Sequence, residues 1–488
     1  MDNLKSIFSK ALPLLVAVVT FFAVCALCFA PQFEGRKIVM HDIQQFDGMS
    51  SDIRAHRAAT GEDPQWTGAM FGGMPAYLIN IKYPAQFIKT VADKVLGAMG
   101  EPLVLIFFAM LSMWLMVVMM GISPWIGVVA GLAYGLSTYF FLIIGAGHIT
   151  KMWAAVYAPA MMGAIYMALR GKMWLGGALA ALFATLEIGA NHPQITYYFL
   201  LAAVALWVND LIFAIKDKAF KSFGKRTAVL AAAAMIAVGA NFSSLYYTME
   251  HSKDTIRGGS EAAAALDGSE AEGLDLDYAT AWSYGITESW TMLVPDFMGG
   301  ESGFDGYSTE RNAPLNSALK EWDWFEFMGV PKSYVIPYFT DITYWGKQPY
   351  TAGPTYLGAV AVLLAVLGIA LASKRNRWWI VAVSLFALLL SWGNNAMWFT
   401  KLCYNYLPMY NKFRTVSMAL VVLQWSVPLL AGIALWQLFK AESRDKIKRA
   451  LLWSVAVTGG VLLLFTVAGG YLFDFGEEQT AMQISARF

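Results

Sequence analysis

Charged side chains are scarce in this chain. Only 14% of the 488 residues are Asp, Glu, Lys or Arg, whereas 58% are hydrophobic, and the mean hydropathy is +0.50. A soluble globule of this length would need far more polar surface than these residues can supply. The composition therefore excludes a soluble protein and indicates a polytopic membrane protein.

Net charge and cysteine are also low. The 35 basic and 34 acidic residues leave a net charge of +1, without a dense basic patch outside short turns, so we expect no nucleic-acid partner. Cys25 and Cys28 fall within the first apolar run and Cys403 stands alone. Three such cysteines suggest neither a disulfide framework nor a zinc site.

Several enzyme and transporter signatures are missing. The sequence has no phosphate-binding glycine loop ending in Lys-Ser/Thr, no His-Glu-x-x-His and no Gly-x-Ser-x-Gly. ATP hydrolysis, zinc proteolysis and serine hydrolysis therefore have no support. We find no internal repeat relating the two halves, which weakens an inverted-repeat transporter assignment.

Long apolar runs are what the sequence does contain. Because about 20 apolar residues cross a bilayer, we predict an all-α bundle of 11 spans. The first run follows Lys5 and Lys10 as in a signal peptide, but its length predicts a retained anchor. The runs are 11–30, 102–122, 124–146, 153–169, 173–190, 195–215, 227–248, 354–373, 378–393, 415–439 and 450–472.

Basic turns orient these spans. Lys and Arg gather near 170–172, 216–226, 374–377 and 440–449, which all fall on the side of the N-terminus and so indicate the cytoplasm. The outer side then receives two long loops and three shorter turns. We divide the chain into an N-terminal transmembrane module (1–248, with the outer loop 31–101), a large outer loop (249–353), C-terminal helices (354–472) and an outer tail (473–488).

The first outer loop opens on Asp42. With Gln45 three residues later, Asp42 forms a capping-box pattern, and Ile43, Phe46 and Ile53 continue at helical spacing. A helix cap is the favoured interpretation of Asp42, and a catalytic base at the membrane surface is the other. The Gly- and Pro-rich segment 64–77 excludes a regular helix, and its aromatic and Met content predicts burial against the membrane domain.

Two further stretches lie in the outer loops. Phe87, Ile88, Val91, Val95 and Met99 share one face of a second predicted interfacial helix. In the large loop, 258–277 is rich in Gly, Ser, Ala and acids and is expected to be a mobile surface segment. Aromatics then recur over 282–350, where an aromatic belt at the bilayer interface is favoured over sugar-face stacking.

Short outer turns hold polar residues that a simple anchor does not need. Ionisable groups at membrane depth are costly and usually face a cavity. Snorkelling would also explain the cations, and helix capping the histidines. Glu187 is four residues before Asn191, which predicts that the two share a helix face. The residues are His148, Lys151, Glu187, Asn191, His192, Gln194, Lys412 and Arg414.

Carboxylates beside cations suit a particular chemistry. Asp42 and Asp47, near Lys151, Lys412 and Arg414, match a reaction in which a sugar leaves a phosphate on a lipid-linked donor. The base takes a proton from an acceptor hydroxyl while the cations hold the departing anion. His148 and His192 with Glu187 form only a weak metal-ligand pattern, so no divalent metal is indicated by a clear motif.

Several motifs together resemble a known family. Asp42-x-x-Gln45, Trp66-Thr-Gly-Ala-Met-Phe-Gly-Gly-Met-Pro75, Asn191-His-Pro-Gln194, Tyr344-Trp-Gly and Pro408-x-x-Asn-Lys-Phe-Arg414 resemble the YfhO family of bacterial membrane proteins, which looks like a branch of the GT-C glycosyltransferases. The resemblance implies an inverting transferase that passes a sugar from a polyprenyl-phosphate carrier to a cell-envelope glycan or glycolipid. Similar members often run longer than this chain.

The same resemblance implies roles for residues. Asp42 matches the catalytic base of GT-C enzymes, and Arg414 matches a basic residue that contacts the carrier phosphate. Gln45, Asp47 and the polar residues of the short turns become substrate contacts in an extracytoplasmic site on the inner membrane. The usual Asp-x-Asp pattern is missing because Ile43 and Gln44 follow Asp42. Alternatives are a transporter or lipid flippase, with a polar path through the membrane, and a non-catalytic scaffold for envelope assembly.

Overall fold

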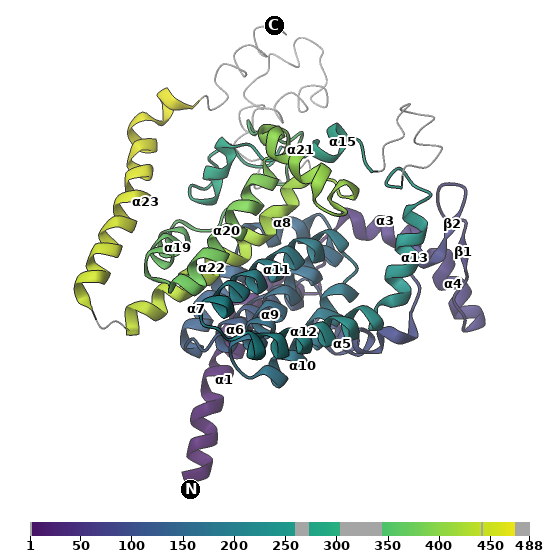
Figure 1. Ribbon diagram of the computed structural model, residues 1–488. Coiled ribbons are helices and arrows are strands. Elements are labelled where there is room, and N and C mark those ends of the chain that lie inside the picture. Colours follow the sequence, from purple (N-terminus) through teal and green to yellow (C-terminus); the bar gives the residue numbers. More distant parts are fainter. Residues whose placement is uncertain (1, 259–272, 303–343, 441–442, 474–488) are drawn as a thin grey trace, which may run out of the picture.

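The computed structural model describes residues 2–258, 273–302, 344–440 and 443–473 (Figure 1). Within these ranges the protein is almost entirely helical, with one two-stranded hairpin, which confirms the all-α prediction. The acid-rich segment 259–272 and much of the aromatic stretch, 303–343, lie outside the described residues, as does 474–488.

Six helices are long and apolar enough to cross a membrane. They are α1 (Asp2–Cys28), α9 (Ile149–Arg170), α11 (Pro193–Lys216), α12 (Phe220–Ala240), α22 (Val421–Lys440, continuing η6 at Val416–Leu420) and α23 (Arg444–Leu472). Two bent pairs bring the number to eight if each is one span. These are α7 (Pro124–Gly135) with α8 (Thr138–Gly145), bent by 45°, and α20 (Lys374–Ser391) with η4 (Gly393–Ala396) and α21 (Met397–Tyr406), bent by 113°.

Three shorter apolar helices occupy the remaining predicted spans. They are α6 (Leu103–Met119), α10 (Met173–Gly189) and α19 (Ala359–Leu371). Each of the eleven apolar runs thus contains a helix, but these three are shorter than the roughly 20 residues that cross a bilayer unaided. The smaller elements are α2 (Ala30–Phe33), η1 (Ala76–Leu78), η2 (Pro84–Gln86), α13 (Phe242–Ser252), α15 (Leu276–Thr280), η3 (Thr287–Met292) and η5 (Tyr410–Lys412).

The core forms where α6, α7, α9 and α10 pack together (Figure 1). Small residues permit the close approach of these helices: a Cβ on Gly176 of α10 would lie 2.3 Å from the backbone nitrogen of Ala168 in α9. The hydroxyl of Tyr134 donates to the carbonyl of Ala155 at 2.7 Å and ties α7 to α9. These contacts hold α9 in the middle of the bundle, with its two ends facing opposite sides.

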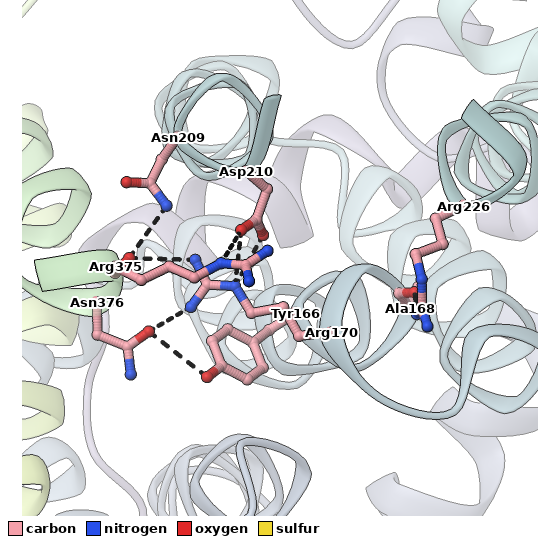
Figure 2. A network of polar contacts seen from close by, with 8 residues as sticks. All are labelled: Tyr166, Ala168, Arg170, Asn209, Asp210, Arg226, Arg375 and Asn376. Atoms are coloured by element: carbon pink, nitrogen blue, oxygen red, sulfur yellow. Dashed lines mark hydrogen bonds and ion pairs between the residues drawn. The ribbon is translucent and has the colours of Figure 1, made fainter. Parts of the chain in front are cut away.

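A polar network joins the helices at the C-terminal end of α9 (Figure 2). Asp210 of α11 is 1% exposed and accepts from Nε of Arg170 at 2.8 Å and from Nε of Arg375 at 2.6 Å. Asn209 donates to the carbonyl of Arg375 at 3.0 Å, and Arg226 of α12 donates to the carbonyl of Ala168 at 2.6 Å. We call this network the basic latch, because its arginines belong to the basic turns of the sequence.

The first outer loop differs from its prediction in two places. The helix predicted through Ile53 is two helices, α3 (His41–Met49) and α4 (Ser51–Thr60), which break at Ser50. Segment 64–77 is not a regular helix, as predicted, and pairs β1 (Trp66–Thr67) with β2 (Met74–Pro75) in an antiparallel hairpin. Its predicted burial is wrong for two aromatic residues, since Trp66 is 60% and Phe71 85% exposed, whereas Met70, Met74 and Tyr77 are half-buried.

Local contacts explain why this hairpin stays outside. Asp52 of α4 accepts from Thr67 Oγ1 at 2.6 Å and from the Gly68 amide at 3.1 Å. At the tip, Phe71, Gly72 and Gly73 have φ values of 54°, 74° and 117°, so the chain reverses tightly. The hairpin is therefore attached to α4, at the edge of the molecule (Figure 1).

The second helix of this loop, α5 (Phe87–Gly97), is apolar on two faces. Ile88, Ala92 and Leu96 pack against the core, whereas Phe87, Val91 and Val95 are 57–66% exposed. Ile88 therefore does not lie on the exposed face with Phe87. An apolar outer face on such a helix agrees with a position at the membrane interface.

Candidate functional site

A cavity of about 530 Å³ lies at the N-terminal end of α9, the end opposite the basic latch, and two of the predicted site residues line it. Its walls come from α8, the first turn of α9, η6 and three outer segments. The lining residues are Tyr139, Leu142, Ile143, Ala146, His148, Lys151, Trp282, Glu301, Ser302, Gln348, Tyr350, Thr351, Ala352, Gly353, Thr355, Thr415, Ser417, Met418 and Leu420.

Lys151 is a buried cation in this lining. Its residue is 6% exposed, and Nζ lies 5.3 Å from the centre of the Tyr139 ring. No carboxylate or hydrogen-bond acceptor contacts its ammonium group in the described part of the chain. A cation–π contact offsets only part of the cost of burying a charge, so the site is suited to an anionic ligand. The snorkelling interpretation is wrong for Lys151, because the side chain is not at the surface.

Asp42 reaches the cavity rim through His148. Its Oδ2 lies 3.2 Å from His148 Nε2, and its backbone amide donates to the carbonyl of Ala146 at 3.4 Å. Gly147 allows this approach, since it has a φ of +87° and a Cβ there would lie 3.1 Å from Asp42 Cβ. The start of α3 therefore rests on the turn between α8 and α9.

The helix-cap interpretation of Asp42 is wrong. The residue in the N-cap position of α3 is Met40, without a side-chain hydrogen bond, and Asp42 lies inside the first turn. The helix begins two residues earlier than the motif predicts, so Asp42 is no longer in the capping position, and no side chain caps the free backbone amides. It pairs with His148 instead. Gln45 is exposed and does not complete a capping box.

The surroundings of His148 favour the neutral form of its imidazole. Burial and the nearby Lys151 ammonium lower its pKa and outweigh the opposite effect of Asp42. Since a carboxylate accepts, Nε2 must carry the proton that Asp42 binds, which leaves Nδ1 as a lone pair. Nδ1 is buried and has no hydrogen-bond partner among the described residues. His148 belongs to the cavity lining, so a molecule bound there would lie beside its imidazole ring.

His192 and Gln194 hold the neighbouring turn. His192 Nδ1 accepts from the amide of Ile195 at 3.4 Å, so its predicted role as a helix cap is confirmed. Burial and the charge of Lys151 lower the pKa of His192 to about 3, which indicates that the two side chains are neighbours. Gln194 Nε2 donates to the carbonyl of Arg414 at 2.7 Å and to the hydroxyl of Tyr198 at 3.0 Å. Gln194 thus joins α11 to the segment that borders the cavity.

The predicted cations of the late loop lie beside the cavity. Arg414 is exposed and its Nη1 donates to the Tyr278 hydroxyl at 2.6 Å, while the next residue, Thr415, lines the cavity. The carbonyl of Lys412 accepts from Arg257 Nε at 3.1 Å. Burial and the charge of Arg414 lower the pKa of Arg257. Arg257 and Arg414 are thus neighbouring cations beside the cavity, and Lys151 is the one Lys or Arg side chain among the described lining residues.

Three other predicted residues lie elsewhere. Glu187 is fully buried near the end of α10, close to Thr196 of α11. The prediction that Glu187 and Asn191 share a helix face is wrong, because α10 ends at Gly189 and Asn191 is exposed with a φ of 60°. Asp47 is exposed and pairs with Arg54 at 2.7 Å. None of the three belongs to the cavity lining.

Aromatic residues of the large loop complete the cavity. The rings of Trp282 and Tyr350 meet edge to face, with their centres 5.2 Å apart, and both residues line the cavity. An interfacial belt therefore does not account for these two side chains. Trp290 does face a membrane helix, with its ring 5.1 Å from that of Phe465 in α23.

Sequence reasoning missed a buried carboxylate behind this wall. Glu288 is 4% exposed and accepts from Gln348 Nε2 at 2.8 Å, from the Tyr344 hydroxyl at 2.8 Å and from the Gly285 amide at 2.9 Å. Burial raises the pKa of this carboxyl group above its usual range. Glu288 holds Gln348 in the cavity lining, and no motif in the sequence distinguishes it from other loop acids.

The described residues do not bring three His, Cys, Asp or Glu side chains together as a metal-binding group, so His148, His192 and Glu187 do not form one. Lys151 and His148, with Asp42 behind it, are the predicted residues that meet at the cavity. Comparison of the chain with protein-family models, curated proteins and solved structures finds no match. The resemblance to YfhO and GT-C proteins stays a prediction.

Proposed function

We propose that the protein is a membrane glycosyltransferase that moves a sugar from a polyprenyl-phosphate-linked donor to a hydroxyl of a cell-envelope glycan or glycolipid. The observation that carries this proposal is the buried ammonium group of Lys151, without a carboxylate partner in the described residues, beside the Asp42–His148 pair. The ammonium group of Lys151 can bind a leaving anion, and the Asp42–His148 pair can accept a proton.

The phosphate of the donor lies against Lys151. Burial strengthens the attraction between the ammonium group and an anion, and this attraction increases as the phosphate gains charge in the transition state. The first turn of α9 adds the partial positive charge of a helix N-terminus. A single lysine can therefore stabilise the leaving group, and the cations of the rim attract the donor to the outer face.

The Asp42–His148 pair accepts the proton. The acceptor oxygen attacks the anomeric carbon and forms the new glycosidic bond as the bond from that carbon to the phosphate oxygen breaks. The hydroxyl proton passes to His148 Nδ1, and the departing phosphate keeps the electron pair. Asp42 orients the imidazole and stabilises its charged form, so the base is a dyad in which the carboxylate acts through histidine.

The distribution of basic residues supports an outer site. The cavity and the basic latch lie at opposite ends of α9, and the latch contains basic residues that the positive-inside rule would assign to the cytoplasm. We propose 11 spans in a GT-C-like arrangement in the bacterial inner membrane, with the N-terminus cytoplasmic. Trp282 and Tyr350, whose rings meet in the cavity wall, would pack on the sugar ring of the donor.

The contacts of two polar residues favour transfer over transport. A transporter predicts a polar path lined by Glu187 and Asn241. Asn241 instead donates to the carbonyls of Thr185 and Ala237, each at 3.0 Å, and accepts from Gln86 at 2.8 Å. Neither Glu187 nor Asn241 belongs to the cavity lining.

The test is donor consumption by the full chain in proteoliposomes. The probe is a polyprenyl-phosphate hexose with a labelled sugar, supplied with an envelope glycolipid fraction, and the readout is release of polyprenyl phosphate. We expect Lys151→Met to reduce the rate roughly 10²- to 10³-fold and Asp42→Asn to reduce it at least about 10²-fold. Both changes approximately preserve side-chain size.

Lys216→Met is the matched control. Lys216 also lies over an aromatic ring, 5.5 Å from the centre of Phe213, but is exposed at the cytoplasmic end of α11. Its replacement should leave the rate unchanged. Unaltered donor consumption by Lys151→Met would contradict the proposal. Movement of the intact donor across the bilayer, without its consumption, would indicate that the protein is a flippase instead of a transferase.

A further inference from the structure

A second hollow lies beside the cavity, between α7 and α19. Its volume is about 370 Å³, and α22 forms its floor. Every lining residue is apolar except Tyr356, and small residues such as Ala133 and Ala361 keep it open. Gly432 brings α22 close to α7, since a Cβ there would lie 3.3 Å from that of Ala130. We call this hollow the lateral groove.

The lateral groove opens toward lipid. At its edges Val129 is 48%, Leu136 41% and Val360 69% exposed, on helices of the membrane region. From Val129 to Leu136 the axis of α7 rises about 10 Å, so the groove follows the helices inward from the outer rim. A hydrocarbon chain is the ligand that this apolar, lipid-facing shape accepts.

One strap, residues 353–358, forms a wall of both hollows. Gly353 and Thr355 line the cavity, and the next three residues, Tyr356 to Gly358, line the lateral groove. Thr138 fixes the strap to the start of α8: its Oγ1 donates to the carbonyl of Pro354 at 2.6 Å and accepts from the amide of Tyr356 at 2.7 Å. The polar and the apolar hollow are therefore immediate neighbours.

We propose that one amphiphile binds astride this strap, with its phosphate at Lys151 and the first part of its hydrocarbon chain in the lateral groove. For the nature of the head group, this inference rests on the proposed function. It adds where the chain enters the protein, between α7 and α19 instead of through any other gap of the bundle.

The groove orients the chain more than it attracts it. A hydrocarbon chain that moves from the bilayer into the groove leaves one apolar environment for another. The gain in free energy therefore comes from close packing and not from the hydrophobic effect. Most of the binding free energy then comes from the phosphate. A hydrocarbon chain bound in this groove would hold the phosphate at Lys151 in one orientation. This orientation would fix the position of the anomeric carbon relative to His148.

Photolabelling tests the inference without needing transfer. The probe is a polyprenyl phosphate with a diazirine in the isoprene unit next to the phosphate, and labelled peptides of the reconstituted full chain are mapped. We expect label in 129–136 and 357–364. The double variant Ala133→Phe, Ala361→Phe should reduce this label by about tenfold, corresponding to about 1.4 kcal/mol. Val at both positions is the milder variant if Phe prevents folding.

Ala234→Phe is the matched control, an exposed alanine on α12 that should leave the label unchanged. Even labelling of lipid-facing helices such as α12 and α23 would overturn the inference. Equal groove labelling by the prenyl alcohol that lacks the phosphate would overturn it too, because the groove would then be an ordinary hollow filled by lipid. Groove labelling without donor consumption contradicts the proposed function alone.

Discussion

Replacing Lys151 with methionine should stabilise the protein while reducing the proposed transfer activity roughly 10²- to 10³-fold. The side chain is 6% exposed, and its one described favourable contact is the Tyr139 ring, 5.3 Å from Nζ. A buried cation–π contact contributes about 2 kcal/mol, whereas removing an ammonium group from water costs several kcal/mol. Methionine has a similar length and no charge to bury.

We therefore expect the variant to gain about 1–3 kcal/mol in stability, the part of the desolvation cost that the ring does not offset. The assay is thermal unfolding of the purified full chain in one detergent, followed by tryptophan fluorescence. The apparent melting temperature should rise by a few degrees, since roughly 1 kcal/mol corresponds to about 2–4 °C in a large domain.

Addition of inorganic phosphate tests whether Lys151 is part of an anion-binding site or is only an unfavourably buried charge. Inorganic phosphate should raise the melting temperature of the wild-type protein and not that of Lys151→Met, because an anion that binds only the folded state stabilises it. A melting temperature that falls in Lys151→Met would refute the reasoning. It would mean that the ammonium group already has a partner and serves the fold.

Four further predictions concern the latch, the two histidines and the hairpin. Asp210→Asn should destabilise the protein by about 3–5 kcal/mol, because it leaves the buried Arg170 without a carboxylate. The control is Asp217→Asn, at an exposed position at the end of the same helix, which should leave the stability unchanged. Equal melting temperatures of the two variants would contradict this role of Asp210. Burial lowers the pKa of His192 to about 3 from an unfolded value of 6.5, so its protonation favours the unfolded state below pH 6.5. Between pH 7 and pH 5 the wild type should lose about 2 kcal/mol more stability than His192→Gln, and equal losses would show that His192 titrates normally. Transfer should decline on acidification only below pH 6.5, because the lowered pKa of His148 keeps it neutral above that value, and a rate that rises with acidification would exclude it as the base. Gly73→Ala should expose the hairpin to proteolysis, since its φ is +117° and the new Cβ would lie 2.4 Å from Trp66 Nε1; Gly68→Ala, which has open space, is the control.

The sequence predicted the helices well because apolar runs of this length have few alternatives in a membrane. Each of the eleven runs contains a helix, and the polar turn with His148 does meet the cavity. Hydropathy could not predict the bends after Gly135 and Ser391, because a bend depends on tertiary contacts such as the bonds of Thr138 to the strap.

Residue roles were harder to predict. The capping-box pattern at Asp42 is local, yet its carboxylate binds a histidine more than 100 positions away, and only the fold brings the two together. Glu187 and Asn191 had the spacing of one helix face, but the helix ends between them. The ion pairs of Asp210 could not be predicted from the sequence, because its partners, Arg170 and Arg375, come from two other helices.

The attachment of the hairpin to α4 has a consequence for measurements of this protein. Asp52 connects the exposed tip around Phe71 to α4, and α4 is joined through Ser50 to α3, which carries Asp42. A force applied at the tip would therefore be transmitted over a short path to Asp42, the partner of the proposed proton acceptor His148. Activity should then vary with the thickness and fluidity of the surrounding lipid, so rates measured in detergent micelles and in native membranes need not agree.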